Sequence, residues 1–162
     1  MTNLGNEGLG SRLRRLLHLL DGDLDVIYAE EAPGYRPRYT PFMKILADGA
    51  PHTIRDLAQA CRVSHSAASQ TISRMMAEGF VAHTAGADAR EREIRLTAAG
   101  DALLPRLRER WETTDRAARD LEAEIGLPLA EVLTRAIAAL ESRPFRDRIR
   151  HSGRPGPGRA SF

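Results

Sequence analysis

The stretch that decides the fold is residues 53–97, TIRDLAQACRVSHSAASQTISRMMAEGFVAHTAGADAREREIRLT. Thr53, followed three residues later by Asp56, is typical of a capping box, in which two side chains satisfy free N–H groups where a helix begins. Apolar side chains then recur at helical spacing, at Ile54, Leu57, Ala58 and Cys61. The sequence therefore predicts a short helix that ends at about residue 61.

A second helix is expected over residues 64–78, beginning at Ser64 and closed by Gly79. Its apolar positions fall on one side, at Ala68, Ile72, Met75 and Met76. Small and polar residues fall on the other, at His65, Ser66, Ser69, Gln70 and Ser73. One side of this helix is therefore suited to packing and the other to contact with a partner.

Residues 80–84 and 93–96 have the character of two short strands, joined by a polar turn over residues 86–91. Two helices separated by a tight turn and followed directly by a hairpin form the winged version of the helix-turn-helix. The second helix of that motif enters the major groove of DNA.

The remaining sequence predicts helices on both sides of this motif. Residues 9–29 carry a helical apolar face that Gly22 could interrupt. Thr40 is expected to be an N-cap with Pro41 at the first helical position, which indicates a helix over residues 40–47. Thr97 is expected to cap a long helix over residues 98–125, and Pro128 to begin another that reaches residue 142. The fold class is therefore mainly α with a small β-hairpin wing.

This pattern divides the chain into four parts. The winged helix-turn-helix lobe occupies residues 39–97. The helices on both sides of it carry apolar faces in excess of what this small lobe can cover, which favours a dimer, so residues 1–38 are expected to be an N-terminal dimerisation helix and loop. C-terminal dimerisation helices follow over residues 98–150. Residues 151–162 are rich in Gly and Pro, and we expect this tail to be disordered.

Composition narrows the class of protein. The chain has 162 residues and 42% hydrophobic residues, enough for a globular core. It contains no apolar run of about 18 residues and no secretory signal, which indicates a cytoplasmic protein without a membrane partner. Lys44 is the single lysine among 24 basic residues. Arginine suits phosphate and guanine, although a genome rich in G and C would produce the same bias.

The chemistry of the polar helix face fits double-stranded DNA. Ser66, Ser69 and Gln70 are short enough for close approach to base edges, and His65 and Ser73 lie on the same face. Arg74, Arg92 and Arg95 are expected to contact phosphates, which fix register rather than read sequence.

Several of these segments resemble the multiple antibiotic resistance regulator (MarR) family. The resemblance is carried by VSHSAASQ at residues 63–70, GFV at residues 79–81, DAR at residues 88–90 and LTAAG at residues 96–100. It extends over about residues 8–142 and is most specific at the wing. The loop YRPRY at residues 35–39 and the basic tail depart from the family pattern.

The resemblance implies roles for two further residues. Arg90 would be the wing-tip arginine that enters the minor groove, and Asp88 the acid that orients it. A narrow minor groove attracts arginine through its enhanced negative potential, which supports this assignment.

The resemblance also implies a mechanism. Such a regulator would read a pseudo-palindromic operator as a homodimer, act as a repressor and be released by a small aromatic or phenolic effector. Residues that could line the effector site are His18, Tyr28, Tyr35, Tyr39, Phe42 and Trp111.

Other readings of the sequence stay open. The domain could be a winged-helix protein-interaction module, or a redox-responsive regulator that uses Cys61, although a cysteine on an apolar helix face is usually inert. The five histidines lack the close spacing of a metal site, and no phosphate loop or nucleophile elbow is present. We therefore expect no enzyme, no cofactor and no metal.

Overall fold

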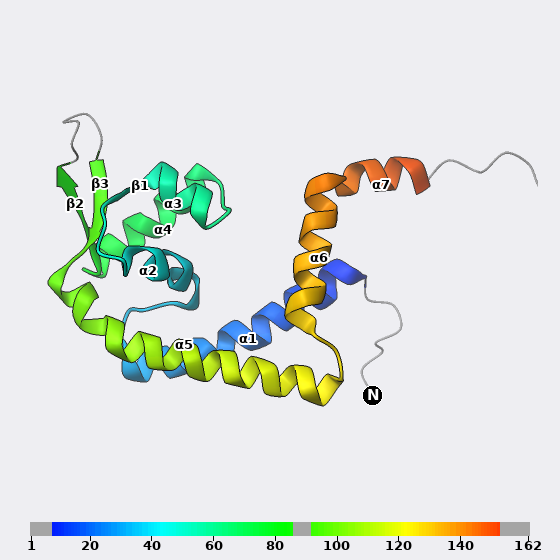
Figure 1. The fold of residues 1–162 in the computed structure, drawn as a ribbon, viewed down its shortest axis with the longest axis horizontal. Coiled ribbons are helices and arrows are strands. Elements are labelled where there is room, and N and C mark those ends of the chain that lie inside the picture. The colour runs from blue at the N-terminus through cyan, green and yellow to red at the C-terminus, as the bar shows by residue number, and fades with distance from the viewer. Residues whose placement is uncertain (1–7, 86–91, 153–162) are drawn as a thin grey trace, which may run out of the picture. The chain divides into compact units, whose positions relative to one another are not determined.

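The computed structural model describes residues 8–85 and 92–152 of the chain, and these form seven α-helices, one short 3₁₀ helix and three strands (Figure 1). Their order is α1 (Leu9–Glu31), η1 (Pro37–Tyr39), α2 (Thr40–Leu46), β1 (His52–Thr53), α3 (Ile54–Ala60), α4 (His65–Ala77), β2 (Val81–Ala85), β3 (Arg92–Leu96), α5 (Ala98–Ile125), α6 (Leu129–Ser142) and α7 (Phe145–Ser152). The expected class, mainly α with a small wing sheet, is confirmed.

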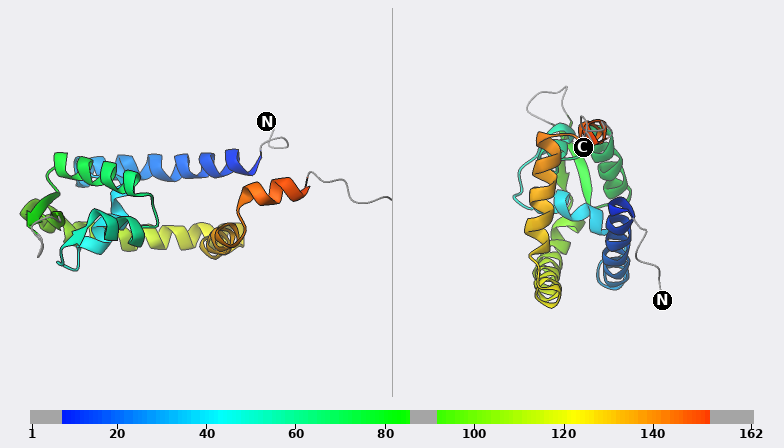
Figure 2. Two further views of the ribbon diagram at one scale, coloured as in Figure 1. Left: turned by 90° about the horizontal axis from the view of Figure 1, so that it is seen from above. Right: turned by 90° about the vertical axis from the view of Figure 1, so that its right-hand side faces the viewer.

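Helix α1 is one continuous helix, and Gly22 does not interrupt it (Figure 2). A single glycine inside a helix costs only about 1 kcal/mol, which the rest of the helix offsets. The C-cap of this helix is Ala32, whose N–H donates to the carbonyl oxygen of Tyr28. Its last turn is fixed to α5 because Arg110 donates two hydrogen bonds, from Nε and from Nη2, to the carboxylate of Glu31.

The start of α2 differs from the expectation. Tyr39 is the N-cap, and Thr40 already belongs to the helix, because η1 runs directly into α2. The Thr40 hydroxyl is therefore not a cap. It lies 2.9 Å from the hydroxyl of Tyr35, with which it shares a hydrogen bond.

The sheet has a third strand that the sequence analysis did not predict. The strand order is β1-β3-β2, all antiparallel, with His52 opposite Ile94 and His83 opposite the same residue from the other side. Strand β1 leads directly into α3. There the predicted capping box is confirmed, with the Asp56 N–H donating to Thr53 Oγ1 over 3.1 Å and the Thr53 N–H donating to the Asp56 carboxylate over 3.1 Å.

Two compact units are distinguished along the chain, Met1–Arg110 and Trp111–Phe162. The first contains the main core, whose largest fully buried side chains come from the loop after α1, from α2, α3, α4, β3 and the start of α5. They are Tyr35, Met43, Leu46, Leu57, Ile72, Met75, Ile94 and Leu107. This core fixes α3 and α4 to the sheet.

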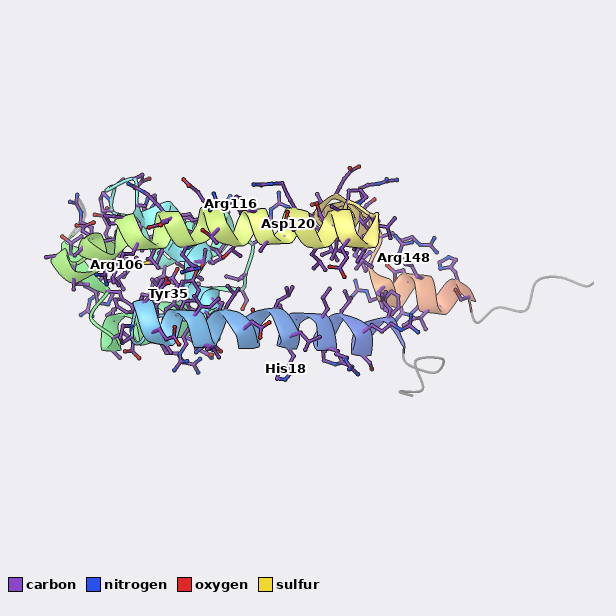
Figure 3. All side chains as sticks on the ribbon, turned by 90° about the horizontal axis from the view of Figure 1, so that it is seen from below. His18, Tyr35, Arg106, Arg116, Asp120 and Arg148 are labelled. Atoms are coloured by element: carbon purple, nitrogen blue, oxygen red, sulfur yellow. The ribbon has the colours of Figure 1, made fainter. Side chains whose placement is uncertain are left out.

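The second unit contains the end of α5 together with α6 and α7. Helix α7 was not predicted, and because it ends at Ser152 the described structure continues past the expected start of the tail at residue 151. Arg148, labelled in Figure 3, fixes the bend between α6 and α7 by donating to the carbonyl oxygens of Ala139 over 2.7 Å and Arg143 over 3.2 Å. Residues 153–162 lie outside the described residues.

No helix within residues 8–85 and 92–152 combines the length and the apolar character needed to cross a membrane.

Candidate nucleic-acid interface

Helix α4 has one buried face and one exposed polar face. Ser64 is its N-cap and accepts a hydrogen bond from the N–H of Ala67 over 3.2 Å. The buried face consists of Ala68, Ile72 and Met75. The residues that are exposed are His65, Ser66, Gln70, Ser73 and Arg74. The structure therefore places these five predicted DNA contacts together.

Ser69 differs from the other predicted contacts, because it is half-buried. It follows Ala68, which is fully buried, and so lies at the border between the two faces of α4. Met76, expected on the apolar side, is also half-buried. Ser69 and Met76 thus lie at the borders between the two faces of α4, and neither belongs fully to the face on which the sequence pattern puts it.

The turn before α4 contains a left-handed residue. Arg62 has a φ of 53°, a conformation that side chains with a Cβ rarely adopt. Its N–H donates to the carbonyl oxygen of Gln59, and the next N–H, of Val63, donates to that of Ala58. Arg62 is exposed beside the start of α4, and the sequence analysis did not single it out. Its position in the turn between the two expected helices could have identified it as a candidate DNA contact.

The wing presents its two described arginines on opposite faces. Side chains alternate along a strand, so Arg92 lies on the same face as the buried Ile94, and Arg95 lies on the other. Both arginines are exposed. Asp88 and Arg90, the predicted wing-tip pair, lie outside the described residues.

The expected effector residues fall into two groups. Tyr35 packs against both Tyr28 and Tyr39, with ring centroids 4.6 and 5.9 Å apart, and all three tyrosines are buried. Figure 3 shows Tyr35 beside the C-terminal end of α1. Phe42 and Trp111 are also buried. His18, by contrast, is exposed and points outward from α1 (Figure 3).

Cys61, which the sequence pattern puts on the apolar side of α3, is the C-cap residue just after that helix, and its N–H donates to the carbonyl oxygen of Leu57. The side chain is half-buried, and burial raises the pKa of the thiol. A raised pKa lowers the thiolate fraction at neutral pH, and the thiolate is the reactive form. Elsewhere, the described residues contain no group of three or more His, Cys, Asp or Glu side chains placed to hold a metal ion.

Comparison with known proteins identifies the motif that these residues form. The MarR family model matches residues 40–91, which begin at α2 and include α3, α4 and β2. Over these residues the chain is similar to the MarR family. A search of the curated proteins gives no match.

Solved structures extend the MarR-like fold over most of the chain. A transcriptional regulator of M. tuberculosis, MosR, solved in complex with DNA, is 22% identical, with 85% of this chain and 99% of that chain covered and a TM-score of 0.65. The S. aureus MepR–DNA complex is 16% identical, with 83% and 100% covered and a TM-score of 0.67. A MarR family regulator of Silicibacter pomeroyi is 24% identical, with 86% and 98% covered and a TM-score of 0.58.

Proposed function

We propose that this chain is a DNA-binding transcriptional regulator that presents α4 to the major groove. The observation that carries the proposal is the exposed polar face of α4, formed by His65, Ser66, Gln70 and Ser73 on a helix whose other face is anchored in the core. Such a helix fits a groove about 12 Å wide, and side chains this short allow hydrogen bonds to base edges. MosR and MepR, which share the fold, were solved with DNA.

The proposed phosphate contacts lie around this helix. Arg74 projects from the last turn of α4, and Arg92 and Arg95 project from the two faces of the wing. Two arginines on opposite faces of a narrow hairpin are suited to the two phosphate strands that border a minor groove. Arg90 is proposed to enter that groove, with Asp88 orienting it.

We further propose a homodimer that represses transcription by occupying a pseudo-palindromic operator. Large apolar side chains are exposed along α1 and α6, among them Leu9, Leu13, Leu17, Leu20, Val132, Ile137 and Leu140. Helix α6 has no buried residue at all within the single chain. Contiguous exposed apolar faces of this kind mark protein–protein contacts. A dimer would also place two recognition helices one helical turn apart on DNA.

Release by a small aromatic effector stays a prediction from the family resemblance. The three tyrosines expected to hold it already pack against one another, and the hydroxyl of Tyr35 is bonded to Thr40. Binding there would require these rings to separate. Loss of tyrosine packing on addition of a phenolic ligand, followed by near-ultraviolet circular dichroism, is the expected signature.

A salt-dependent gel shift tests the proposal. If each subunit of a dimer contacts phosphates through Arg74, Arg92 and Arg95, a plot of log affinity against log salt should have a slope of about −5. Affinity should then fall about 1,000-fold between 50 and 200 mM salt. A protein-interaction module would bind genomic fragments weakly or not at all, and that result would remove the DNA-binding proposal.

The redox alternative depends on Cys61 alone. Because burial raises the pKa of this thiol, we expect peroxide to leave operator binding unchanged in the wild type and in Cys61→Ser alike. Peroxide that abolishes binding by the wild type but not by Cys61→Ser would establish the alternative.

A further inference from the structure

We infer that Thr97 and Gly100 are positioning residues that set the direction of the recognition helix by holding its C-terminal end against α5. The segment they hold is Glu78–Phe80, named here the α4 end segment. This inference rests on the proposed function, because the direction of α4 matters only if α4 reads DNA. It concerns residues that make no proposed contact with DNA.

The first contact with the α4 end segment comes from Thr97. Its hydroxyl donates to the carbonyl oxygen of Gly79 over 2.6 Å and also lies 3.3 Å from that of Phe80. Its N–H donates to the Phe80 carbonyl oxygen over 3.0 Å. The same hydroxyl accepts the N–H of Gly100 over 3.0 Å and so caps α5. One side chain thus joins the end of the recognition helix to the beginning of α5.

The second contact depends on the absence of a side chain at Gly100. A Cβ built on this residue would overlap the carbonyl oxygen of Phe80 and would lie 3.1 Å from its carbonyl carbon and 3.3 Å from Leu96 Cδ2. The obstructing atoms of Phe80 are backbone, which cannot rotate away. Gly100 is buried and lies within α5, where alanine would ordinarily stabilise the helix. Glycine here permits a close approach of α5 to the α4 end segment.

The opposite side of the α4 end segment meets the loop after α1. The Phe80 ring lies 6.2 Å from the ring of Tyr35, centroid to centroid, and both side chains are buried. The carboxylate of Glu78 lies directly against Gly34, which has a φ of 84°. The loop that follows α1 and the start of α5 therefore both contact the end of α4. In the proposed arrangement, a shift of either one would change the direction of the recognition helix.

This arrangement makes a prediction about substitutions that weaken the contacts of the α4 end segment. They should change the distance between the two recognition helices of a dimer and should leave unchanged the contacts of one recognition helix with its bases. Gly100→Ala forces Phe80 away from α5 and turns the winged lobe, α4 included, relative to α5. In a dimer that turn is applied twice, so the preferred distance between half-sites should change. The contacts of a single α4 with a single half-site involve other atoms and should persist.

The experiment uses the full chain and an operator selected from random DNA with the wild type. We expect Gly100→Ala to bind a duplex with one half-site within twofold of the wild type, and to bind the full operator at least tenfold more weakly, with a different optimum when the half-site spacing is varied. Gly22→Ala is the matched control, because nothing lies within 4 Å of a Cβ at that glycine of α1.

A second pair of variants covers the case in which Gly100→Ala does not fold. Thr97→Val keeps the shape of the side chain but removes the hydrogen bonds of its hydroxyl, whereas Thr97→Ser keeps them. The backbone N–H of residue 97 can donate to Phe80 in both variants. Thr97→Val should shift the spacing optimum, and Thr97→Ser should restore it. An unchanged optimum in every folded variant, or equal losses on half-site and full operator, would overturn the inference. If the wild type itself fails to bind DNA, the proposed function fails instead.

Discussion

Arg62 has a backbone conformation that is unfavourable for a residue with a Cβ. With a φ of 53° it occupies the left-handed region in the turn between α3 and α4. For a residue with a Cβ this conformation costs roughly 1–2 kcal/mol of conformational free energy, whereas glycine adopts it without that cost. Retaining arginine there is consistent with a role for its charge beside the recognition helix.

We predict that Arg62→Gly increases the free energy of unfolding and weakens DNA binding. The relief of backbone strain is reduced by the greater entropy of glycine in the unfolded chain and by the loss of the side-chain interaction of Arg62, and should leave a gain of at most about 1 kcal/mol. Thermal denaturation should show a rise in Tm of about 2–3 °C. Arg55→Gly removes the same charge from the ordinary first turn of α3 and should not stabilise the protein. A lower Tm for Arg62→Gly would contradict the strain argument.

Arg90 supplies the second prediction at this scale. Arg90→Ala should weaken operator binding at least tenfold and flatten any preference for A·T pairs beneath the wing, because the narrow minor groove no longer receives a cation. Binding is compared on operators that differ only at those pairs. Arg119→Ala, an exposed arginine of α5 outside the winged motif, is the control. Unchanged affinity of Arg90→Ala at moderate salt would remove the wing assignment.

At the scale of the elements, the N-terminus of α3 is stabilised by a capping box that includes a titratable group, the carboxylate of Asp56. The hydrogen bonds that Thr53 donates from its hydroxyl and its N–H lower the pKa of Asp56 below the ordinary value. Because the folded pKa is the lower one, the capping contribution is complete above about pH 4 and is lost as the pH falls through the folded pKa. The backbone N–H of Ala50 lowers the pKa of Asp48 in the same direction.

We therefore predict that the stability of the chain falls between about pH 4 and pH 2, and that part of this fall requires Asp56. Thr53→Ala, which removes the hydroxyl from the box, should cost about 1 kcal/mol at pH 7 and less at pH 2. The difference is the bond to the Asp56 carboxylate, because the bond that the hydroxyl accepts from the Asp56 N–H does not titrate. Asp56→Asn should flatten the same part of the curve. Urea unfolding at a series of pH values provides the measurement, and parallel curves for wild type and Asp56→Asn would contradict it.

The elements also show what the sequence could and could not predict. Capping signals are local, so the Thr53–Asp56 box, the Ser64 cap and the Thr97 cap were all located in advance. Strand β1 has two residues and exists only because His52 and Thr53 pair with β3, about forty residues later in the chain. No local pattern reveals such a pairing. The same applies to η1, which displaced the expected cap from Thr40 to Tyr39.

Part of the candidate interface could also be predicted from the sequence. Helical periodicity separated the polar face of α4 from its buried face, because that division depends only on the sequence of one helix. The half-burial of Ser69 depends on how the core packs around α4. The role of Gly100 depends on a backbone carbonyl contributed by Phe80, so only the folded chain reveals it.

For the whole molecule, the unburied apolar residues are the feature that needs an explanation. Within the single chain α6 and α7 have no buried residue, and Leu9 and Leu17 of α1 are 71% and 58% exposed. A chain that left these faces in water would expose large apolar side chains along three helices, which is unusual for a monomer. A second copy of the same chain would cover them, and the proposed operator symmetry requires that copy.

The last prediction tests this homodimer through α6. Leu140 is 45% exposed on the apolar side of α6, and Leu140→Glu would place a carboxylate in the proposed interface, where an unpaired buried charge costs several kcal/mol. We expect the variant to sediment as a monomer at micromolar concentration and to bind the full operator at least 100-fold more weakly. Ala138→Glu adds the same charge to the opposite, polar side of α6 and should remain dimeric. A dimeric Leu140→Glu, or a monomeric wild type, would contradict the proposed use of this helix.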